Sequence, residues 1–232
     1  MINKTQASRK KVAQLNDSIY ILTLQVLVFI SLHFNPLSSK AGESHLDFDT
    51  NTVSVERFIR LDSQGAPAQI APVGANNLSW ECVLDTETAL VWEVKTIAGL
   101  RNRQNTYTWY NPNSRTNGGD SGYPNGGQCS DSPCDTSLYV EAINKTALCG
   151  YHSWRLPSRE ELRSLVDYEA RAPHPVINKQ YFPQSMMQFY WSSTPDASDA
   201  DSAWGIGFTF GYDYSYFKSD LGFIRLVTNY RR

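Results

Sequence analysis

Three tyrosines near the C-terminal end are the residues best suited to bind a ligand. Tyr212, Tyr214 and Tyr216 alternate with Asp213 and Ser215, so a strand here would place all three rings on one face. Tyrosine combines a broad apolar ring with a hydroxyl, and an exposed row could therefore stack on sugars or contact a protein. A hairpin whose tyrosines cover the rim of the core would give the same pattern. Complete burial of the three rings would exclude the binding role.

A long irregular segment is the second candidate for binding. Residues 111–132 consist almost entirely of Gly, Asn, Ser, Asp and Pro. Loops of this length in a compact domain are usually functional or clamped, and binding residues concentrate in them. We therefore predict a binding surface that combines the tyrosine row with the loop around residues 117–125. Its loop residues would be Asn117, Asp120, Tyr123 and Asn125.

Residues for making or breaking bonds are scarce. His152 and His174 are the obvious candidates, but a single histidine near a tryptophan is more often structural. Glu160 and Glu161 fall in the first turn of an expected helix, where acids serve as caps. The sequence contains no G-x-S-x-G, no H-E-x-x-H and no phosphate loop. We expect no catalytic residue; a hydrolase would need one of the histidines in a cleft beside a carboxylate.

An acidic run is the one candidate for a metal site. Asp196, Asp199 and Asp201 offer three carboxylates, which are ligands that calcium prefers. Such a run more often forms the solvated tip of a hairpin. We therefore predict neither a metal nor another cofactor, with calcium as the less favoured alternative.

The four cysteines are predicted to form two disulfides. Three pairings are possible in principle. Cys129 and Cys134 flank the turn-forming sequence Ser-Asp-Ser-Pro, which could bring them together and leave Cys82 to pair with Cys149. A zinc site would need closer cysteine pairs or accompanying histidines. The favoured pairing would clamp the long loop.

The N-terminal residues have the pattern of an export signal. Residues 1–18 carry four basic residues and one acid, residues 19–32 are mostly apolar, and Ser39-Lys40-Ala41 is a small-x-small exit. The apolar run is shorter than the ~20 residues of a membrane span. We predict a signal peptide over residues 1–41, with an uncleaved anchor as the alternative, and a tether over 42–54. A secreted or cell-envelope location (periplasm or cell surface) follows, with no stable membrane span once the signal is removed.

The charge balance restricts the class of partner. The chain has 21 Lys+Arg and 23 Asp+Glu, which is a net charge of −2. Removal of residues 1–41 takes away five basic residues and one acid, and leaves a mildly acidic domain. A general nucleic-acid binder would carry a basic excess. The expected partner is a polysaccharide or a surface protein, and the sequence fixes no oligomeric state.

The predicted elements describe an α+β domain over residues 55–232. Two central helices are expected, over residues 135–148 and from Ser158 to about Glu169, the second opened by a capping box between Ser158 and Glu161. Strands on both sides of the helices would form antiparallel sheets. The expected strands cover residues 55–61, 80–85, 89–94, 189–194 and 203–210, with further pieces at 217 and 222–227.

The ordered set of these segments resembles the Lcl C-terminal domain family, named for a bacterial collagen-like adhesin. Ala89 departs from the family, which usually has glycine at this turn. The resemblance implies a C-type-lectin-like fold, similar also to the formylglycine-generating enzymes, and an extracytoplasmic role in attachment; the founding adhesin binds sulfated polysaccharides. It implies no catalytic residue. The segments that carry it include RFIRLD (57–62), WECVLD (80–85), TALVWE (88–93), LCG (148–150), WRLPS (154–158), YFP (181–183), YWSST (190–194) and IRLV (224–227).

Two details of the sequence separate this chain from its enzymatic and lectin analogues. No cysteine follows Cys149, so the late reactive pair of a formylglycine-type oxidase is absent from the sequence. The calcium-dependent sugar motifs of true C-type lectins are absent from it too. We predict an exported binding module that recognises a surface polymer, with glycan favoured. A structural or protein-binding subunit of an envelope assembly is the alternative, and it would show a contiguous exposed apolar patch.

Overall fold

The computed structural model describes residues 56–68, 80–170 and 175–231. The predicted signal peptide (1–41), the predicted tether (42–54) and His174 lie outside these residues. The described residues all belong to one compact unit, Thr52–Arg232. No helix in this described part of the chain is both long enough and apolar enough to cross a membrane.

The first sheet has four antiparallel strands in the order β1-β2-β3-β7. Strands β2 and β3 are buried along their whole length, because both faces of the sheet are covered. The turn between them ends at Ala89, whose φ of 55° is left-handed. That value explains why a glycine is usual at this position of the turn. The strands are β1 (Phe58–Leu61), β2 (Cys82–Asp85), β3 (Leu90–Glu93) and β7 (Val227–Asn229).

The second sheet has three antiparallel strands in the order β4-β5-β6. They are β4 (Phe189–Pro195), β5 (Ser202–Gly207) and β6 (Tyr212–Phe217). The expected strand over 203–210 is shorter than predicted, because the Gly207 carbonyl accepts from Phe210 and Gly211 and turns the chain. The expected strand over 222–227 is mostly bridges to separate segments, and only β7 is regular.

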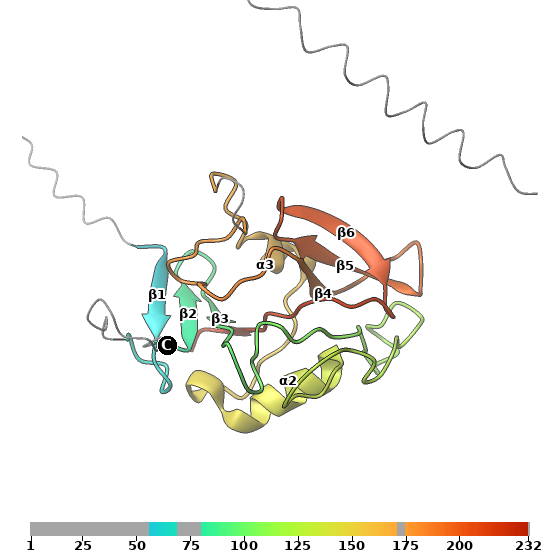
Figure 1. Cartoon of the computed structure of the whole chain (residues 1–232), viewed down its shortest axis with the longest axis horizontal. Helices are drawn as coiled ribbons and strands as arrows, with labels where there is room; N and C mark the ends of the chain where they lie inside the picture. Colours follow the sequence, from blue (N-terminus) through green and yellow to red (C-terminus); the bar gives the residue numbers. More distant parts are fainter. Residues whose placement is uncertain (1–55, 69–79, 171–174, 232) are drawn as a thin grey trace, which may run out of the picture. The chain divides into compact units, whose positions relative to one another are not determined.

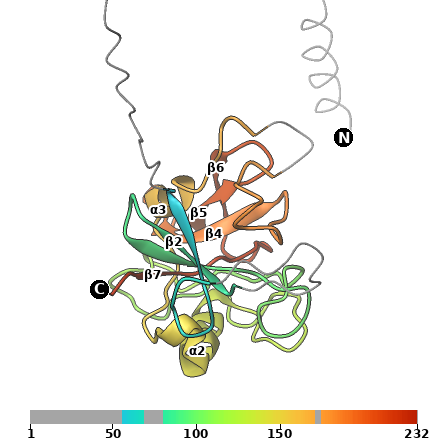
Figure 2. The same cartoon turned by 90° about the vertical axis from the view of Figure 1, so that its left-hand side faces the viewer.

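Two described helices connect the sheets. Helix α2 (Thr136–Thr146) begins at Asp135, whose side chain accepts from Leu138 N at 2.8 Å, and ends at the left-handed Ala147. Helix α3 (Arg159–Arg163) begins with the predicted capping box. It ends well before Glu169, so the predicted length was wrong. In both views α2 lies on the side of the domain away from β6 (Figures 1 and 2).

The core consists of two main clusters, and the described fold is a sheet-rich α+β domain. One cluster surrounds Trp92, which is fully buried, and the other surrounds the Cys82–Cys149 disulfide. A third, smaller cluster joins Trp109 to Trp191 under the second sheet. This third cluster includes residues of β4 and β5, and β5 pairs with β6, the strand of the tyrosine row.

Candidate functional site

The three tyrosines lie on one face of β6 and are exposed. Their exposed fractions are 61% for Tyr212, 38% for Tyr214 and 41% for Tyr216, so the burial that would exclude a binding role is not found. They are paired across the sheet with Gly207, Gly205 and Ala203 of β5. Because these partners are small, the tyrosine rings can lean over β5. A side chain at Gly207 would meet the Tyr214 ring at 2.9 Å.

Further aromatic rings extend the tyrosine row. The Phe189 ring of β4 meets Tyr216 edge-on at 4.5 Å between centroids, and Phe210 lies 6.3 Å from Tyr212. Tyr214 and Tyr216 are 6.0 Å apart. The row therefore covers the rim of the third cluster and also presents rings to solvent. Phe210 is exposed and precedes the row at the same spacing of two, but it was not among the predicted ligand-binding residues.

Lys218, directly after β6, holds the long loop against this sheet. Its ammonium donates to the backbone carbonyl oxygens of Asn117 (2.8 Å), Asp120 (2.7 Å) and Ala200 (2.5 Å). It also lies 4.6 Å from the centre of the Trp109 ring, and Lys218 is only 1% exposed. Burial lowers the pKa of Lys218, and nearby aspartates oppose that shift. The ammonium thus links two irregular segments: the long loop, through Asn117 and Asp120, and the β4–β5 turn, through Ala200.

The loop packs directly on the β4–β5 hairpin. A side chain added to Gly118 would lie 2.6 Å from Pro195 at the end of β4, and one added to Gly119 would lie 3.4 Å from Ala200. Lys218 follows Tyr216 in the same alternation. The tyrosine row therefore ends where the loop begins to cover the sheet. The two predicted parts of the binding surface are neighbours at this end.

The four loop residues predicted to bind a ligand have different surroundings. Asn117 is buried: its amide donates to Asn111 O (3.3 Å) and its Oδ1 accepts from Gly119 N (3.0 Å). Asp120 is half-buried, and its Oδ1 accepts a hydrogen bond from Gly122 N at 2.6 Å. One of its two carboxylate oxygens is therefore used to stabilise the loop. The structure thus gives Asn117 a supporting position inside the loop and not a surface position.

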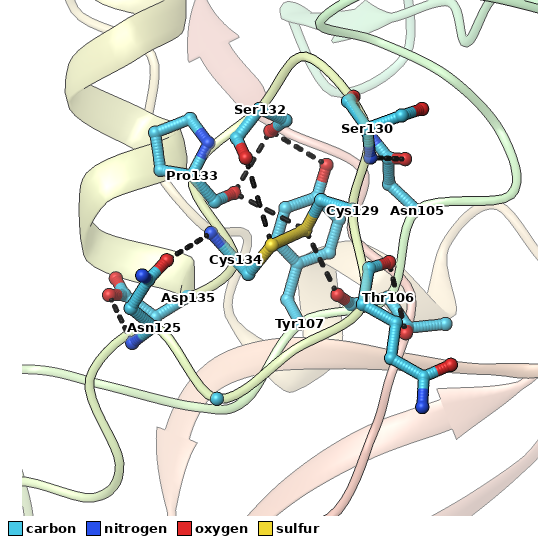
Figure 3. Close-up of a disulfide and its surroundings, with 12 residues drawn as sticks. Asn105, Thr106, Tyr107, Asn125, Cys129, Ser130, Ser132, Pro133, Cys134 and Asp135 are labelled. Carbon is cyan, nitrogen blue, oxygen red and sulfur yellow. Dashed lines mark hydrogen bonds between the residues drawn. A yellow bond between two sulfur atoms is a disulfide. The ribbon is translucent and has the colours of Figure 1, made fainter.

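Asn125 and Tyr123 occupy the other end of the loop. Asn125 is held at both backbone and side chain, because its N donates to Asp135 Oδ2 (2.8 Å) and its Oδ1 accepts from Cys134 N (2.9 Å; Figure 3). Its φ of 51° is left-handed. Tyr123 is 59% exposed, and its ring is the loop side chain most available to a ligand among the four.

Both predicted disulfide pairings are present. Cys82–Cys149 joins β2 to the short 3-10 helix Leu148–Gly150, with a Cα–Cα distance of 6.5 Å. Cys129–Cys134 closes the end of the long loop, with a Cα–Cα distance of 5.6 Å. Figure 3 shows this second disulfide beside Tyr107, whose hydroxyl lies 3.4 Å from Ser132 Oγ. The loop is therefore clamped by Lys218 at one end and by a disulfide at the other.

The acidic run forms a hairpin tip between β4 and β5. Asp196 Oδ1 accepts from Ser198 N at 2.9 Å, and Asp199 Oδ2 accepts from Ser202 Oγ at 2.8 Å. The nearby Ser215 hydroxyl and the hydrogen bonds from Ser198 lower the pKa of Asp196. Within the described ranges, no three His, Cys, Asp or Glu side chains form a group that could hold a metal ion.

The histidine candidate His152 and the charged residues around the start of α3 have local partners. His152 is exposed, and its Nδ1 lies 3.2 Å from Asn144 O. Arg155 makes a forked pair with Glu161 at 2.7 and 2.8 Å, and this pairing lowers the pKa of Glu161. Glu161 also caps α3 by accepting from Ser158 N at 2.8 Å. These contacts hold the segment from Arg155 to Ser158 against the first turn of α3.

A separate cavity of about 560 Å³ lies beside the Cys82–Cys149 disulfide. The C-terminal end of α2 and the chain after β3 line it, together with the Arg101–Glu81 ion pair (3.0 Å). None of the predicted ligand-binding residues lines this cavity, and neither does His152, the catalytic candidate within the described residues.

A buried structural cluster shifts the pKa values of two of its members. Lys95 Nζ donates to Glu93 Oε1 (3.0 Å) and to the Tyr139 hydroxyl (2.8 Å), and Tyr139 in turn donates to Glu93. Burial lowers the pKa of Lys95 to about 8, against the opposing effect of Glu93. Burial and the Glu93 charge raise the pKa of Tyr139. All three side chains are buried, so a ligand at the surface does not reach them.

Comparison with known families gives one match over most of the domain. The model of the Lcl C-terminal domain matches residues 81–228, which is well over half of the chain. No curated protein matches the chain, and no solved structure matches it. The matched range contains both disulfides, the long loop and the tyrosine row.

Proposed function

The chain belongs to the Lcl C-terminal domain family, and from this premise we propose that it is an exported attachment module that binds a surface glycan. The family is that of an adhesin-related extracellular domain. We assign the domain a C-type-lectin-like fold on the same ground. We propose that the domain recognises the glycan noncovalently, without a catalytic residue or a cofactor.

The observation that carries the proposal is the exposed tyrosine row on a rigid sheet. Tyr212, Tyr214 and Tyr216 give apolar area and hydroxyls at little entropic cost, because each ring has only two rotatable bonds. Their backbone is fixed by pairing along the whole of β5. A glycan that stacks on the row would therefore meet rings that are already ordered.

Export is supported by the cysteines. Disulfides persist in oxidising compartments and are rare in the cytoplasm. All four cysteines of the chain are paired in two disulfides. We propose a secreted or cell-envelope location on this basis.

A glycan array probed with the exported protein tests the proposal. We expect binding that is unchanged by a calcium chelator and is lost stepwise in Tyr212→Ser, Tyr214→Ser and Tyr216→Ser, by roughly tenfold per ring. Tyr230→Ser is the matched control, because Tyr230 is exposed to the same 38% as Tyr214 but lies beyond β7 in the other sheet. Binding that survives all three substitutions would refute the assignment of this surface.

A second candidate function is docking to a protein in an envelope assembly. The observation that favours it is apolar: Phe210, Phe217 and Leu221 are exposed, with Phe210 beside Tyr212 and Phe217 at the end of β6. Protein docking would depend on these three side chains, whereas stacking on a glycan would depend on the tyrosines. Phe217→Ser separates the two functions, because Phe217 alternates with the tyrosines and belongs to the other face of β6.

A further inference from the structure

We infer that the tyrosine row takes an uncharged, extended polysaccharide chain and discriminates against sulfated and other anionic glycans. This inference rests on the proposed function and adds the chemical class of the ligand. It departs from the sulfated polysaccharides that the family resemblance of the sequence implies. The charges of this chain's own residues and the spacing of its rings carry it.

The sheet that presents the row contains acidic residues but no basic ones. Residues 189–217, which span β4, β5 and β6, contain no Lys, Arg or His. The same residues contain four aspartates: Asp196, Asp199, Asp201 and Asp213. A polyanion is bound through basic residues that neutralise its charges, and this sheet supplies none.

Three cations contact this sheet or directly follow it, and all three already have partners. The ammonium of Lys218 is enclosed by three carbonyl oxygens and by the loop, so it cannot reach a sulfate at the surface. Arg159 and Arg163 of α3 lie within 3.6 and 3.9 Å of Asp213. Asp213 alternates with the tyrosines, which places this ion pair on the opposite face of the sheet.

The long loop does not supply the missing positive charge. Between residues 111 and 125 it contains one basic residue, Arg115, and one acid, Asp120. The loop reaches the sheet next to the acidic hairpin tip, where Gly119 packs on Ala200. The end of the row near Tyr216 therefore lies beside the acidic hairpin tip.

The ring spacing favours an extended chain over a compact sugar. Tyr214 and Tyr216 are 6.0 Å apart, and Phe210 and Tyr212 are 6.3 Å apart. A strand rises about 3.3 Å per residue, so the row from Tyr212 to Tyr216 is roughly 13 Å long. Successive rings are thus separated by a distance comparable with one sugar ring. A chain laid along β6 would contact several rings at once, whereas a monosaccharide would contact one.

The test compares neutral and sulfated ligands of the same backbone. The probes are β-linked glucan and xylan oligosaccharides, from dimers to hexamers, and their sulfated derivatives, with affinity measured by calorimetry at low and high NaCl. We expect the neutral series to gain affinity with length until the row is covered, with no dependence on salt. The sulfated series should bind at least about tenfold more weakly at low salt, where repulsion is least screened.

A charge variant makes the test specific. Asp201→Lys changes an exposed side chain at the hairpin tip whose carboxylate makes no hydrogen bond within the described structure. The variant should improve binding of the sulfated series and leave binding of the neutral series unchanged. Thermal unfolding checks that Asp201→Lys and the Tyr→Ser variants remain folded, and Tyr214→Phe keeps the ring if Tyr214→Ser does not fold.

The outcomes separate the inference from the proposed function. Preferential binding of sulfated chains that depends on the tyrosines would overturn the inference and leave the glycan-binding function intact. Preferential binding of sulfated chains that is unchanged in the Tyr→Ser variants would overturn both the inference and the assignment of the binding surface. No binding of either series, together with no binding on the array, would overturn the proposed function itself.

Discussion

Replacement of Lys218 by methionine isolates the contribution of one buried ammonium to the candidate site. Methionine keeps an unbranched stem of similar length over the Trp109 ring. It removes the positive charge and all three donors to Asn117 O, Asp120 O and Ala200 O. The substitution therefore tests the polar clamp with little change in packing.

The expected loss follows from the number of bonds. A hydrogen bond that involves a charged group contributes about 1.5–3 kcal/mol, and a buried acceptor left without a partner costs about 1–3 kcal/mol. Full additivity would overstate the effect, because the loop can open and let water reach the carbonyls. We expect the free energy of unfolding to fall by about 3 kcal/mol, or the melting temperature by about 6–12 °C for a domain of this size.

The assay combines thermal unfolding with amide hydrogen exchange. Exchange should accelerate in residues 117–122 and in the hairpin tip around Ala200, and it should stay slow in β2 and β3. Glycan affinity should fall with the loosening of the loop, even though Lys218 itself does not touch a ligand. A falling affinity with unchanged exchange would mean direct contact and would contradict the positioning role.

The matched control is Lys145→Met on the exposed face of α2. Among the residues that the structure describes, the Lys145 ammonium contacts only Glu141, an i,i+4 pair at 3.8 Å, and exposed pairs of this kind contribute about 0.3–0.5 kcal/mol. If Lys218→Met cost no more than this control, the reasoning from the buried carbonyl cluster would be refuted.

Three further predictions concern stability. Ala89→Gly should raise the unfolding free energy by about 1 kcal/mol in chemical denaturation, because Ala89 has a left-handed φ of 55°. The pKa of Lys95 is about 8 in the folded state and about 10.4 unfolded, so the unfolded chain binds more protons between these values. Stability should therefore rise from about pH 8 to about pH 10 and then fall as the buried tyrosines titrate; a steady decline over this range in denaturation at graded pH would contradict the burial of Lys95. Cys82→Ser with Cys149→Ser should cost about 4 kcal/mol, since that disulfide closes a loop with a sequence separation of 67. Equal losses for this pair and for the short Cys129–Cys134 loop in the same denaturation assay would contradict the chain-entropy argument.

Local rules predicted the elements whose determinants are close in sequence. Asp135 caps α2, Ser158 and Glu161 cap α3, and the alternation of β6 exposes its tyrosines. Each of these features depends on residues within a few positions of one another. The disulfide pairing was predictable for the same reason, since a short turn sequence joined Cys129 to its partner.

Features decided by distant contacts were not predictable. Helix α3 was expected to reach Glu169, but the Asp167 N donates to Val176 O and draws the chain away from the helix. Asn117 was expected at the surface, yet Lys218, a hundred residues further along the chain, pulls the backbone of the loop inward. The sequence contains no periodic pattern that relates two such positions.

The Lys218 contacts give a physical reason for the absence of a calcium requirement in the proposed function. Backbone carbonyl oxygens that converge from separate loops, with carboxylates nearby, are the ligands that calcium prefers. In this domain an ammonium group occupies the point of convergence, and it is tethered to β6 through its own backbone. A divalent ion at that point would have to displace a buried charge that already satisfies all three carbonyls. The chain therefore orders its loop with a cation of its own, and the loop should keep its shape in a chelator.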